Sequence, residues 1–550
     1  MSLFSNLDRD ELSSRLAAET FDLLIIGGGI TGAGIALDAT TRGLKVALVE
    51  QNDFASGTSS KSTKLIHGGL RYLKQFDFWL VKEVGSERAI LHKLAPHLVV
   101  PDKMILPIIE NGTYGSWLTS IGLKIYDILA DVEGDDKRLM LDKETTLVKE
   151  PLLPEAILEG AGFYAEYRTD DARLTLEVLK TAVKHKALAL NYAEVKFLKN
   201  ENDTVIGAQV YDHLLEKEVS VKARYVVNAT GPWVDDVREH MDTVYKRSKR
   251  LQLTKGVHLV FPYEKLPVKQ SVYFDVPDGR MIFAIPRGKI TYVGTTDTKF
   301  EREPETVEVE LVDTLYLINA VNNMFPDINL ELEDVISSWA GLRPLIYEEG
   351  KSAGELSRKD EIFESDSGLI SIAGGKLTGY RKMAERIVDL IDKRASKDHA
   401  LKLKAIQTEK LPLNENPFKN YAEVKKYVQD IQPDWQAFGF SLIDIESLVH
   451  RYGRQTDLIL ERFQQIPEED AQLRLAKAEL WYGIHHEMVV KPLDFFERRT
   501  GRLYFDPFEL DHLKDPILKE FTDYFNWDKN TLVLEREHLE KAFKGIREFQ

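Results

Sequence analysis

Three glycines near the N-terminus constrain the fold of this chain more than any other sequence feature. They follow a short apolar run at 21–26, which is suited to a buried parallel strand. The glycines are Gly27, Gly29 and Gly32. A helix with a periodic apolar face comes next, and an apolar run at 45–49 then predicts a second strand that ends at Glu50. This order of elements predicts the first part of a parallel α/β sheet.

Each part of this unit has a physical role in holding a dinucleotide. Gly27 permits the tight turn, Gly29 lets the backbone approach a pyrophosphate, and Gly32 lets the helix pack closely on the strand. The pyrophosphate lies at the helix N-terminus, where free N–H groups and the dipole favour negative charge. Glu50, eighteen positions past Gly32, accepts hydrogen bonds from a ribose hydroxyl. Three such glycines alone are weak evidence, but the complete order of strand, turn, helix, strand and acid predicts a dinucleotide site.

Three later segments favour FAD as this dinucleotide. A predicted strand at 224–227 leads into a small turn that ends in glycine, where backbone can approach a ligand closely. A second strand, at 369–373, runs into a Gly-Gly turn and a helix whose N-terminus could stabilise charge on a reduced flavin. Residues 58–72 are rich in hydroxyl and amide donors, as a ribityl-phosphate site requires. The predicted cofactor-binding residues are Gly27, Gly29, Gly32, Glu50, Thr58, Ser59, Ser60, Lys64, His67, Gly68, Ala229, Gly231, Gly375, Lys376, Leu377 and Thr378.

Composition excludes several other kinds of chemistry. The chain has 550 residues, too many for one core, and no cysteine, which excludes disulfides, thiol nucleophiles and Cys-ligated metal. A net charge of -16 argues against nucleic acid as a partner, so an anionic substrate needs a local basic pocket. The first residues do not have the pattern of a signal peptide, and no stretch of about 18 apolar residues predicts a membrane span. The sequence contains no second glycine fingerprint, so we expect no separate NAD(P)H-binding domain. Electrons would then pass from the flavin to a quinone, to oxygen or to a protein.

Taken together, these motifs resemble those of the FAD-dependent glycerol-3-phosphate dehydrogenases. The similar stretches are 58–72 (TSSKSTKLIHGGLRY), 255–258 (KGVH), 294–297 (GTTD), 341–344 (GLRP), 374–378 (GGKLT) and 481–499. The resemblance covers nearly the whole chain and implies an α/β fold with a glutathione-reductase-like FAD-binding Rossmann domain, an antiparallel-sheet substrate domain and a C-terminal helical domain. The expected ranges are 1–80, 160–240 and 350–395 for the FAD domain, 85–155 and 240–350 for the substrate domain, and 400–550 for the helical domain.

The resemblance also implies an activity. The family oxidises sn-glycerol 3-phosphate to dihydroxyacetone phosphate by hydride transfer from C2 to flavin N5. Its membrane dehydrogenases pass electrons to quinone, whereas a related oxidase branch passes them to oxygen and makes hydrogen peroxide. The oxidases carry an extra insertion in the substrate region that this sequence does not show, so we expect a quinone acceptor, with oxygen as the alternative. Two further hypotheses are a different flavin oxidoreductase, such as an amino-acid oxidase, and a flavin-binding sensor without turnover.

The chemistry needs an anion clamp and a proton acceptor close to the flavin. By resemblance, Arg71, Arg343 and Lys376 line the active site, and an arginine fork can grip phosphate with two hydrogen bonds. Lys376 could instead stabilise the reduced ring, and the residues alone leave the two roles open. Tyr72 would add a hydroxyl donor. The predicted substrate-binding residues are Arg71, Tyr72, His258, Arg343 and Lys376, of which His258, Arg343 and Lys376 are also the predicted catalytic residues.

His258 is the predicted proton acceptor, because an imidazole with an ordinary pKa of roughly 6.5 takes up a proton near neutral pH. The alternative is a hydrogen-bonded core histidine at the start of a strand. His67 is its rival for the role, although its position in a loop favours a flavin contact. The adjacent His485 and His486 point to different helix faces, so they are interpreted as structural and no metal is expected.

One segment and one basic cluster predict contact with a membrane surface. Residues 114–129 predict a helix with an apolar face, with Trp117 and Tyr126 suited to an interface. The basic cluster at 246–250 could meet anionic lipid. The alternatives are an ordinary core helix and a solvated charged face. We therefore expect a cytoplasmic protein that binds peripherally to the inner face of the cell membrane, and leave monomer and homodimer open.

Overall fold

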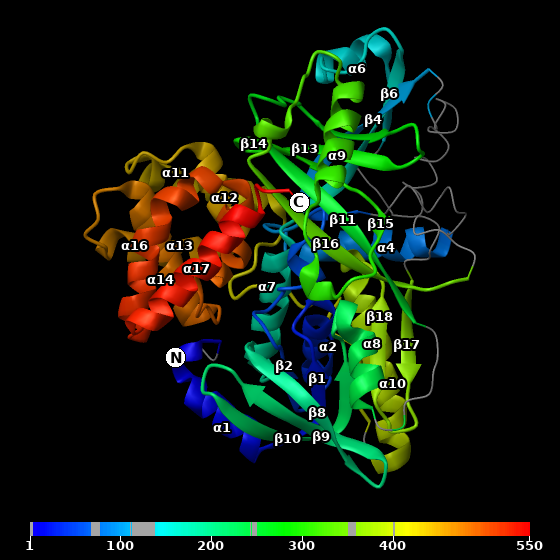
Figure 1. The fold of residues 1–550 in the computed structure, drawn as a ribbon, viewed down its shortest axis with the longest axis vertical. Helices are drawn as coiled ribbons and strands as arrows, with labels where there is room; N and C mark the ends of the chain where they lie inside the picture. The colour runs from blue at the N-terminus through cyan, green and yellow to red at the C-terminus, as the bar shows by residue number, and fades with distance from the viewer. Residues whose placement is uncertain are drawn as a thin grey trace.

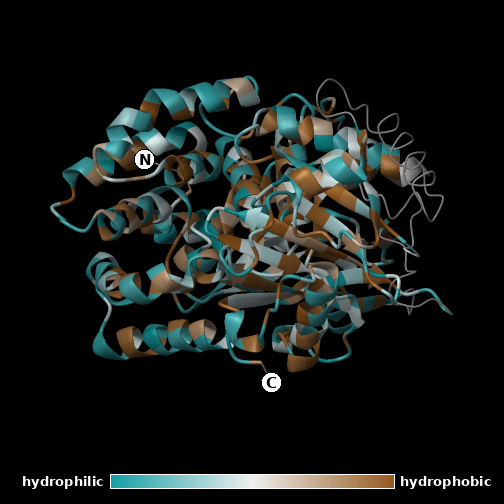
Figure 2. Cartoon of the chain, turned by 90° about the horizontal axis from the view of Figure 1, so that it is seen from above, coloured by the Kyte–Doolittle hydropathy of each residue, from teal (hydrophilic) through white to brown (hydrophobic). Residues whose placement is uncertain are grey.

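The chain folds into two sheets and a C-terminal group of helices (Figure 1). The computed structural model describes residues 4–67, 78–110, 112, 138–242, 244, 250–349, 359–399 and 402–549. Apolar residues concentrate in the strands and in the inner faces of the helices (Figure 2). The structure confirms the predicted α/β class with a helical C-terminal part.

The first sheet is built around parallel strands that carry the glycine turns. Its main order is β17 (Asp360–Glu364), β18 (Ile370–Gly374), β10 (Lys217–Asn228), β1 (Thr20–Ile26), β2 (Val46–Val49) and β7 (Leu188–Leu190), and β8 (Ala193–Glu201) and β9 (Thr204–Asp212) extend it beside β10. Ile26 of β1 pairs with Asn228 of β10, and β2 and β18 run parallel to these strands. The carboxyl ends of the four strands therefore meet at one edge, as the sequence predicts for a parallel sheet.

Helices cover this sheet and bury its apolar strands. They are α1 (Arg9–Ala18), α2 (Ile30–Thr41), α4 (Phe78–Leu94), α7 (Asp171–Lys184), α8 (Val234–Asp236) and α10 (Tyr380–His399). The predicted helix after the glycines is α2, which packs against both α7 and α10. Helix α4 reaches into the predicted substrate segment 85–155 from residue 85 on, and its Leu91 and Leu94 pack in the core of the first sheet. The predicted domain ranges stay predictions.

The second sheet is antiparallel apart from one pair of strands. Its main order is β15 (Thr298–Lys299), β11 (Leu251–Pro262), β14 (Ile290–Gly294), β13 (Met281–Arg287), β12 (Ser271–Asp275), β4 (Val100–Ile109), β6 (Leu158–Arg168) and β3 (Leu65–Ile66), with β16 (Ser337–Ile346) paired to β11 and β5 (Leu139–Asp142) paired to β6. Only β12 and β4 run parallel among these described strands. Helices α6 (Lys143–Lys149) and α9 (Leu311–Met324) belong to the same part of the chain. The predicted antiparallel sheet is thereby confirmed.

The C-terminal part is helical, as the sequence patterns predict. Its helices are α11 (Tyr421–Gln436), α12 (Leu442–Tyr452), α13 (Thr456–Gln465), α14 (Ala471–His486), α15 (Arg502–Phe505), α16 (Pro507–Phe525) and α17 (Lys529–Gly545). Trp435, Phe440 and Phe463 form an aromatic centre within this group. Short helical turns used below are η2 (Thr58–Ser60), η4 (Gly231–Trp233), η8 (Leu377–Gly379) and η10 (Asp494–Arg499).

The membrane predictions fall largely on residues that the structure does not describe. Residues 114–129 lie outside the described ranges, and of the basic cluster only Arg250 lies within them. No helix in the described part of the chain combines the length and apolarity needed to span a bilayer.

Candidate active site

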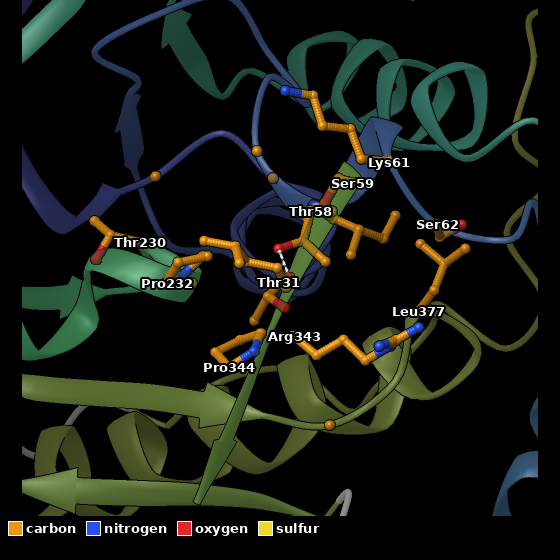
Figure 3. A pocket seen from close by; sticks show the side chains of 18 of the residues that line it. Thr31, Thr58, Ser59, Lys61, Ser62, Thr230, Pro232, Arg343, Pro344 and Leu377 are labelled. Carbon is orange, nitrogen blue, oxygen red and sulfur yellow. Dashed lines mark hydrogen bonds between the residues drawn. The ribbon is translucent and has the colours of Figure 1, made fainter. Parts of the chain in front are cut away.

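A large cavity lies where the carboxyl edge of the first sheet faces the second sheet. Loops from both sheets line it, and Figure 3 shows Thr58, Thr230, Leu377 and Arg343 around it from four different segments. The predicted site residues that line it are Gly27, Gly29, Glu50, Thr58, Ser59, His67, Ala229, Gly231, His258, Arg343, Gly375, Lys376, Leu377 and Thr378. Gly68, Arg71 and Tyr72 lie outside the described residues, so their placement stays a prediction.

The first glycine turn has the close backbone approach that the sequence predicts. Gly27 has φ +111°, and a Cβ there would lie 2.6 Å from the carbonyl oxygen of Ala229. Gly32 does not line the cavity, but a Cβ there would lie 2.0 Å from the carbonyl oxygen of Gly27. Side chains at these two positions would push the turn away from β10 or from α2. The turn therefore depends on both glycines, and it presents the N-terminus of α2 to the cavity.

Glu50 closes the same end of the cavity. Its carboxylate accepts hydrogen bonds from the backbone N–H groups of Gly28 at 2.7 Å and Asn52 at 2.9 Å. Burial raises the pKa of Glu50 above its ordinary value, while these two hydrogen bonds oppose that shift. The acid thus lies beside the glycine turn, where the sequence predicts a ribose contact.

In the hydroxyl-rich segment that begins at residue 58, some residues line the cavity and others hold the segment in place. Thr58 donates to the carbonyl oxygen of Leu342 at 2.6 Å, and Ser59 accepts from the N–H of Ile30 at 3.0 Å, which caps α2. Ser60 and Lys64, both predicted to bind the cofactor, do not line the cavity. Lys64 is buried, and its ammonium lies 2.5 Å from the carboxylate of Asp171 at the start of α7. In this arrangement Lys64 ties the loop to α7.

His258 lies in β11, opposite Gly294 of β14 and Trp339 of β16. Its ring stacks on the Trp339 indole with centroids 4.7 Å apart, and Nε2 lies 2.9 Å from the Thr63 hydroxyl. Among the described residues, its Nδ1 has no hydrogen-bond partner. Burial, and secondly the positive charges of Arg343 and Lys64, hold the pKa of His258 well below its ordinary value. The imidazole is therefore neutral near pH 7, as a proton acceptor must be, but it is a weaker base than the ordinary imidazole on which the prediction from the sequence rests.

Arg343 lies on β16, next to the strand that carries His258. It donates to the Thr295 hydroxyl at 2.8 Å and to the Thr296 carbonyl oxygen at 3.2 Å. Its guanidinium also lies 3.3 Å from the carboxylate of Asp297. Residues 294–297 and 341–344, distant in sequence, therefore meet beside the cavity, which Thr295 and residues 341–344 line.

Two glycines leave the space that these two side chains occupy. A Cβ on Gly256 would lie 2.1 Å from a guanidinium nitrogen of Arg343. A Cβ on Gly294 would lie 2.1 Å from Cδ2 of His258. Both glycines belong to motifs that the sequence singles out, and their function here is to admit a neighbouring side chain.

Several lining residues were not predicted from the sequence. They are mainly Lys61, Ser62, Thr63, Trp233, Tyr273, Met281 and Phe283. Tyr273 and Phe283 stack with centroids 4.1 Å apart, and the His67 ring meets Phe283 edge-on at 5.8 Å, which gives the cavity an aromatic wall. Thr63 falls inside the 58–72 motif, so its hydroxyl was a visible signal. The aromatic wall depends on strand register, which the sequence does not reveal.

Comparison with known proteins identifies the family. Residues 22–381 match the family model described as FAD dependent oxidoreductase, and residues 407–532 match that of the C-terminal domain of alpha-glycerophosphate oxidase. The chain is 49% identical over 541 residues to the aerobic glycerol-3-phosphate dehydrogenase of Bacillus subtilis (strain 168), covering 98% of this chain and 97% of that protein. The chain belongs to the FAD-dependent glycerol-3-phosphate dehydrogenase family. A Staphylococcus aureus (strain USA300) protein of the same name is 46% identical over 543 residues, with the same coverage.

Solved structures agree with this family. The glycerol-3-phosphate dehydrogenase from Bacillus halodurans complexed with FAD superposes with a TM-score of 0.84 at 40% identity, covering 100% of this chain and 99% of that one. The L-alpha-glycerophosphate oxidase from Mycoplasma pneumoniae shares the fold, with a TM-score of 0.54 at 20% identity over 73% of this chain and 98% of that one. As a family member, this chain is an FAD-dependent oxidoreductase, and the glycine turn, the α2 N-terminus and Glu50 fit that cofactor.

The space beside His258 leads to a first prediction. In Gly294→Ala, the new methyl group should displace the imidazole of His258, the predicted proton acceptor, and slow flavin reduction by roughly 100-fold, because small misplacements of a reacting group are costly. Anaerobic stopped-flow absorbance would measure the rate. Gly545→Ala, at a position with open space near the C-terminus, is the control and should react like wild type. An unchanged rate in Gly294→Ala would contradict the placement of His258.

Proposed function

We propose that this enzyme oxidises sn-glycerol 3-phosphate at its secondary alcohol to dihydroxyacetone phosphate and passes the electrons to a quinone. The observation that carries the proposal is the meeting of a neutral histidine and an arginine in the cavity that the dinucleotide loops also line. Relatives 49% and 46% identical are named aerobic glycerol-3-phosphate dehydrogenases, which supports the substrate. When bound, FAD supplies the hydride acceptor, flavin N5.

His258 acts as the acceptor for the proton of the C2 hydroxyl. Because burial and neighbouring cations disfavour its charged form, the imidazole is neutral before substrate binds. A phosphate dianion that binds beside Arg343 would partly cancel those positive charges, which raises the basicity of His258 when substrate is present. Stacking on Trp339 holds the ring in one plane, so the proton acceptor is already oriented.

Arg343 binds the phosphate. Thr295, Thr296 and Asp297 hold its guanidinium, so little side-chain freedom is lost when an anion binds. We propose that Arg71 and Tyr72 complete this clamp. Lys376 lines the cavity at the N-terminus of η8, where we propose that its charge and the adjacent N–H groups stabilise negative charge on the reduced ring.

One observation favours a second candidate function. The family model that matches the C-terminal part bears the name of alpha-glycerophosphate oxidase, so the same scaffold is associated with an oxygen acceptor. In the oxidase alternative, the substrate half-reaction is unchanged and reduced flavin yields hydrogen peroxide. We further propose cytoplasmic, peripheral membrane association, which would bring the enzyme to a lipid-soluble quinone.

The anion clamp predicts the effect of removing Arg343. Arg343→Ala should lower kcat/KM for glycerol 3-phosphate at least about 100-fold, since a charge-assisted fork to phosphate is lost. Steady-state dye reduction would measure this loss, and FAD absorbance would confirm that cofactor is retained. Arg302→Ala removes an exposed arginine paired with Glu310 outside the cavity and should behave like wild type. Equal loss with glycerol as substrate would overturn the phosphate role.

The proton acceptor predicts a pH-dependent result. His258→Asn should slow flavin reduction by roughly 100-fold or more, because general-base catalysis by a positioned imidazole contributes about that much. The low pKa of His258 keeps the wild-type imidazole neutral at neutral and alkaline pH, so its contribution is lost only toward acid. Stopped-flow rates of flavin reduction between pH 6 and 9 should therefore stay high in the wild type and low in His258→Asn. If the variant reduces flavin at the wild-type rate throughout that range, His258 is not the proton acceptor.

The acceptor can be tested directly. With a soluble quinone analogue present, we expect quinone reduction to exceed peroxide formation severalfold in air. Coupled peroxidase fluorescence and quinone absorbance measure the two products in one sample. Stoichiometric peroxide with oxygen as the sole acceptor, at a rate equal to that with quinone, would favour the oxidase alternative and exclude the dehydrogenase.

A further inference from the structure

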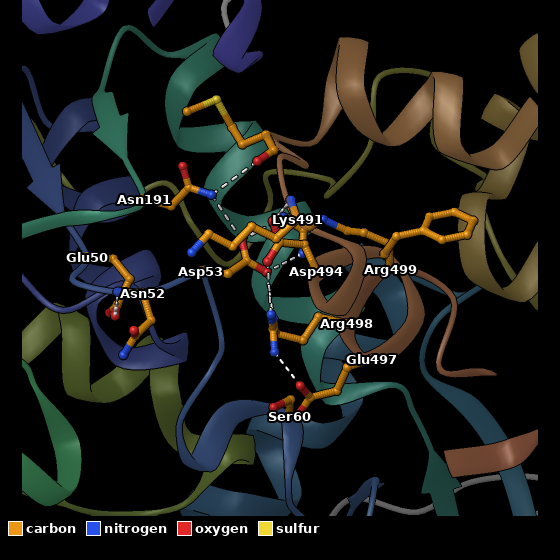
Figure 4. A network of polar contacts seen from close by, with 12 residues as sticks. Glu50, Asn52, Asp53, Ser60, Asn191, Lys491, Asp494, Glu497, Arg498 and Arg499 are labelled. Atoms are coloured by element: carbon orange, nitrogen blue, oxygen red, sulfur yellow. Dashed lines mark hydrogen bonds and ion pairs between the residues drawn. The ribbon is translucent and has the colours of Figure 1, made fainter. Parts of the chain in front are cut away.

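A buried ion network joins the segment after β2 to the C-terminal turn η10 (Figure 4). The Asp53 carboxylate accepts from Arg498 Nε at 2.6 Å and from the two terminal nitrogens of Arg499 at 2.7 and 2.9 Å. The Asp53, Arg499 and Arg498 side chains are only 0%, 1% and 7% exposed. Burial alone would raise the pKa of Asp53, but Arg499 and Arg498 lower it to about 2, so the carboxylate is ionised.

Asp53 belongs to a segment that surrounds one residue of the glycine turn, Gly28. The N–H of Gly28 donates to Glu50 at 2.7 Å, and its carbonyl oxygen accepts from the N–H of Ala55 at 3.1 Å. Phe54 packs against it so closely that a Cβ on Gly28 would lie 2.6 Å from the phenyl ring. Residues 50–55 thus bind the backbone N–H and carbonyl groups of Gly28 and pack against the side of Gly28 where a Cβ would lie. Asp53 is the residue of this segment that η10 contacts directly.

A second connection runs in parallel through Tyr192. Its backbone N–H donates to the carbonyl oxygen of Asn52 at 2.8 Å, while its hydroxyl donates to the Asp494 carboxylate at 2.6 Å. Asp494 also accepts from Arg498 at 3.0 Å, which makes η10 one unit with two attachments. Asn52 lines the cavity, whereas Asp53 and η10 do not.

Burying these charges carries a desolvation penalty, which the attraction and hydrogen bonds between them only partly offset. Among the described residues, none after Met383 lines the cavity, so the C-terminal part influences the site only through other residues. Its attachment to residues 50–55 is one such path, because the lining residues Asn52 and Glu50 lie one and three positions before Asp53. A brace of this kind lowers the ordering cost that a ligand would otherwise meet on binding.

We infer that η10 braces the pyrophosphate and ribose loop through Asp53, so that docking of the C-terminal helices sets the affinity for FAD. Asp53, Arg498 and Arg499 are positioning residues in this scheme. The inference rests on the proposed placement of FAD along Gly27, Gly29 and Glu50. It assigns the C-terminal part a role in cofactor retention, in addition to its own folding.

The test compares two buried arginines in the same C-terminal part. In Arg499→Gln, the dissociation constant for FAD, measured by fluorescence titration of apoprotein, should rise at least about tenfold. Arg499→Lys, which keeps the charge, should recover part of that affinity. The matched control is Arg502→Gln: Arg502 pairs at 2.6 Å with Glu479, inside the C-terminal helices, and its side chain is 9% exposed. It should lower the melting temperature of the apoprotein comparably and leave FAD affinity unchanged. Equal FAD affinities in Arg499→Gln and Arg502→Gln would overturn the inference.

A measurement on the unaltered enzyme covers the case in which Arg499→Gln does not fold. Hydrogen exchange of the wild-type apoprotein and holoenzyme should show that FAD slows exchange in peptides from 488–506, although these residues do not line the cavity. No change there would also overturn the inference.

Glu50→Gln separates the placement of FAD from the brace. If Glu50→Gln leaves FAD affinity intact, the placement of FAD is wrong; if it weakens binding while Arg499→Gln does not, only the brace is wrong.

Discussion

The site depends on the parallel alignment of β1, β2, β10 and β18. Because their carboxyl ends share one edge, the turns that follow them meet although they begin near residues 27, 50, 229 and 375. The backbone at this edge supplies N–H groups and close approach, which suit a long anionic dinucleotide better than side chains would. Gly27 and Gly32 are needed because neighbouring backbone occupies the space where a Cβ would lie.

The second sheet places the proposed reactive groups by a different geometry. Antiparallel pairing of β11 with β16 and β14 places His258 against Trp339 and Gly294, and Thr254 against Arg343. A strand is a rigid support, so the imidazole and the guanidinium keep their spacing without contributions from long flexible loops. The two sheets thus have separate roles, since the first is suited to bind the dinucleotide and the second to bind the substrate and accept its proton.

Positive and negative side chains occur together both in the cavity lining and behind it. The chain carries a net charge of -16, yet the cavity is lined by Arg343, Lys61 and Lys376 as well as by the carboxylates Glu50 and Asp236. Behind the cavity, buried cations are matched by carboxylates, as in Lys64 with Asp171 and Arg499 with Asp53. Such pairs give each of these buried charges a counter-charge, and they fix loops that would otherwise be free to move.

The sequence by itself determined the features that depend on neighbouring residues. Strand, glycine turn, helix, strand and acid were all predicted at 21–50, because apolar periodicity and glycine placement act over short distances. The family motifs also identified His258, Arg343 and Lys376 as residues of one site, and the structure places all three in one cavity. Only the tertiary structure decided which neighbours they meet. Strand register set Trp339 beside His258, and buried packing turned Lys64 toward Asp171 and away from the cavity. The contact of Asp53 with Arg498 spans 445 positions, and no local pattern encodes a contact over that distance.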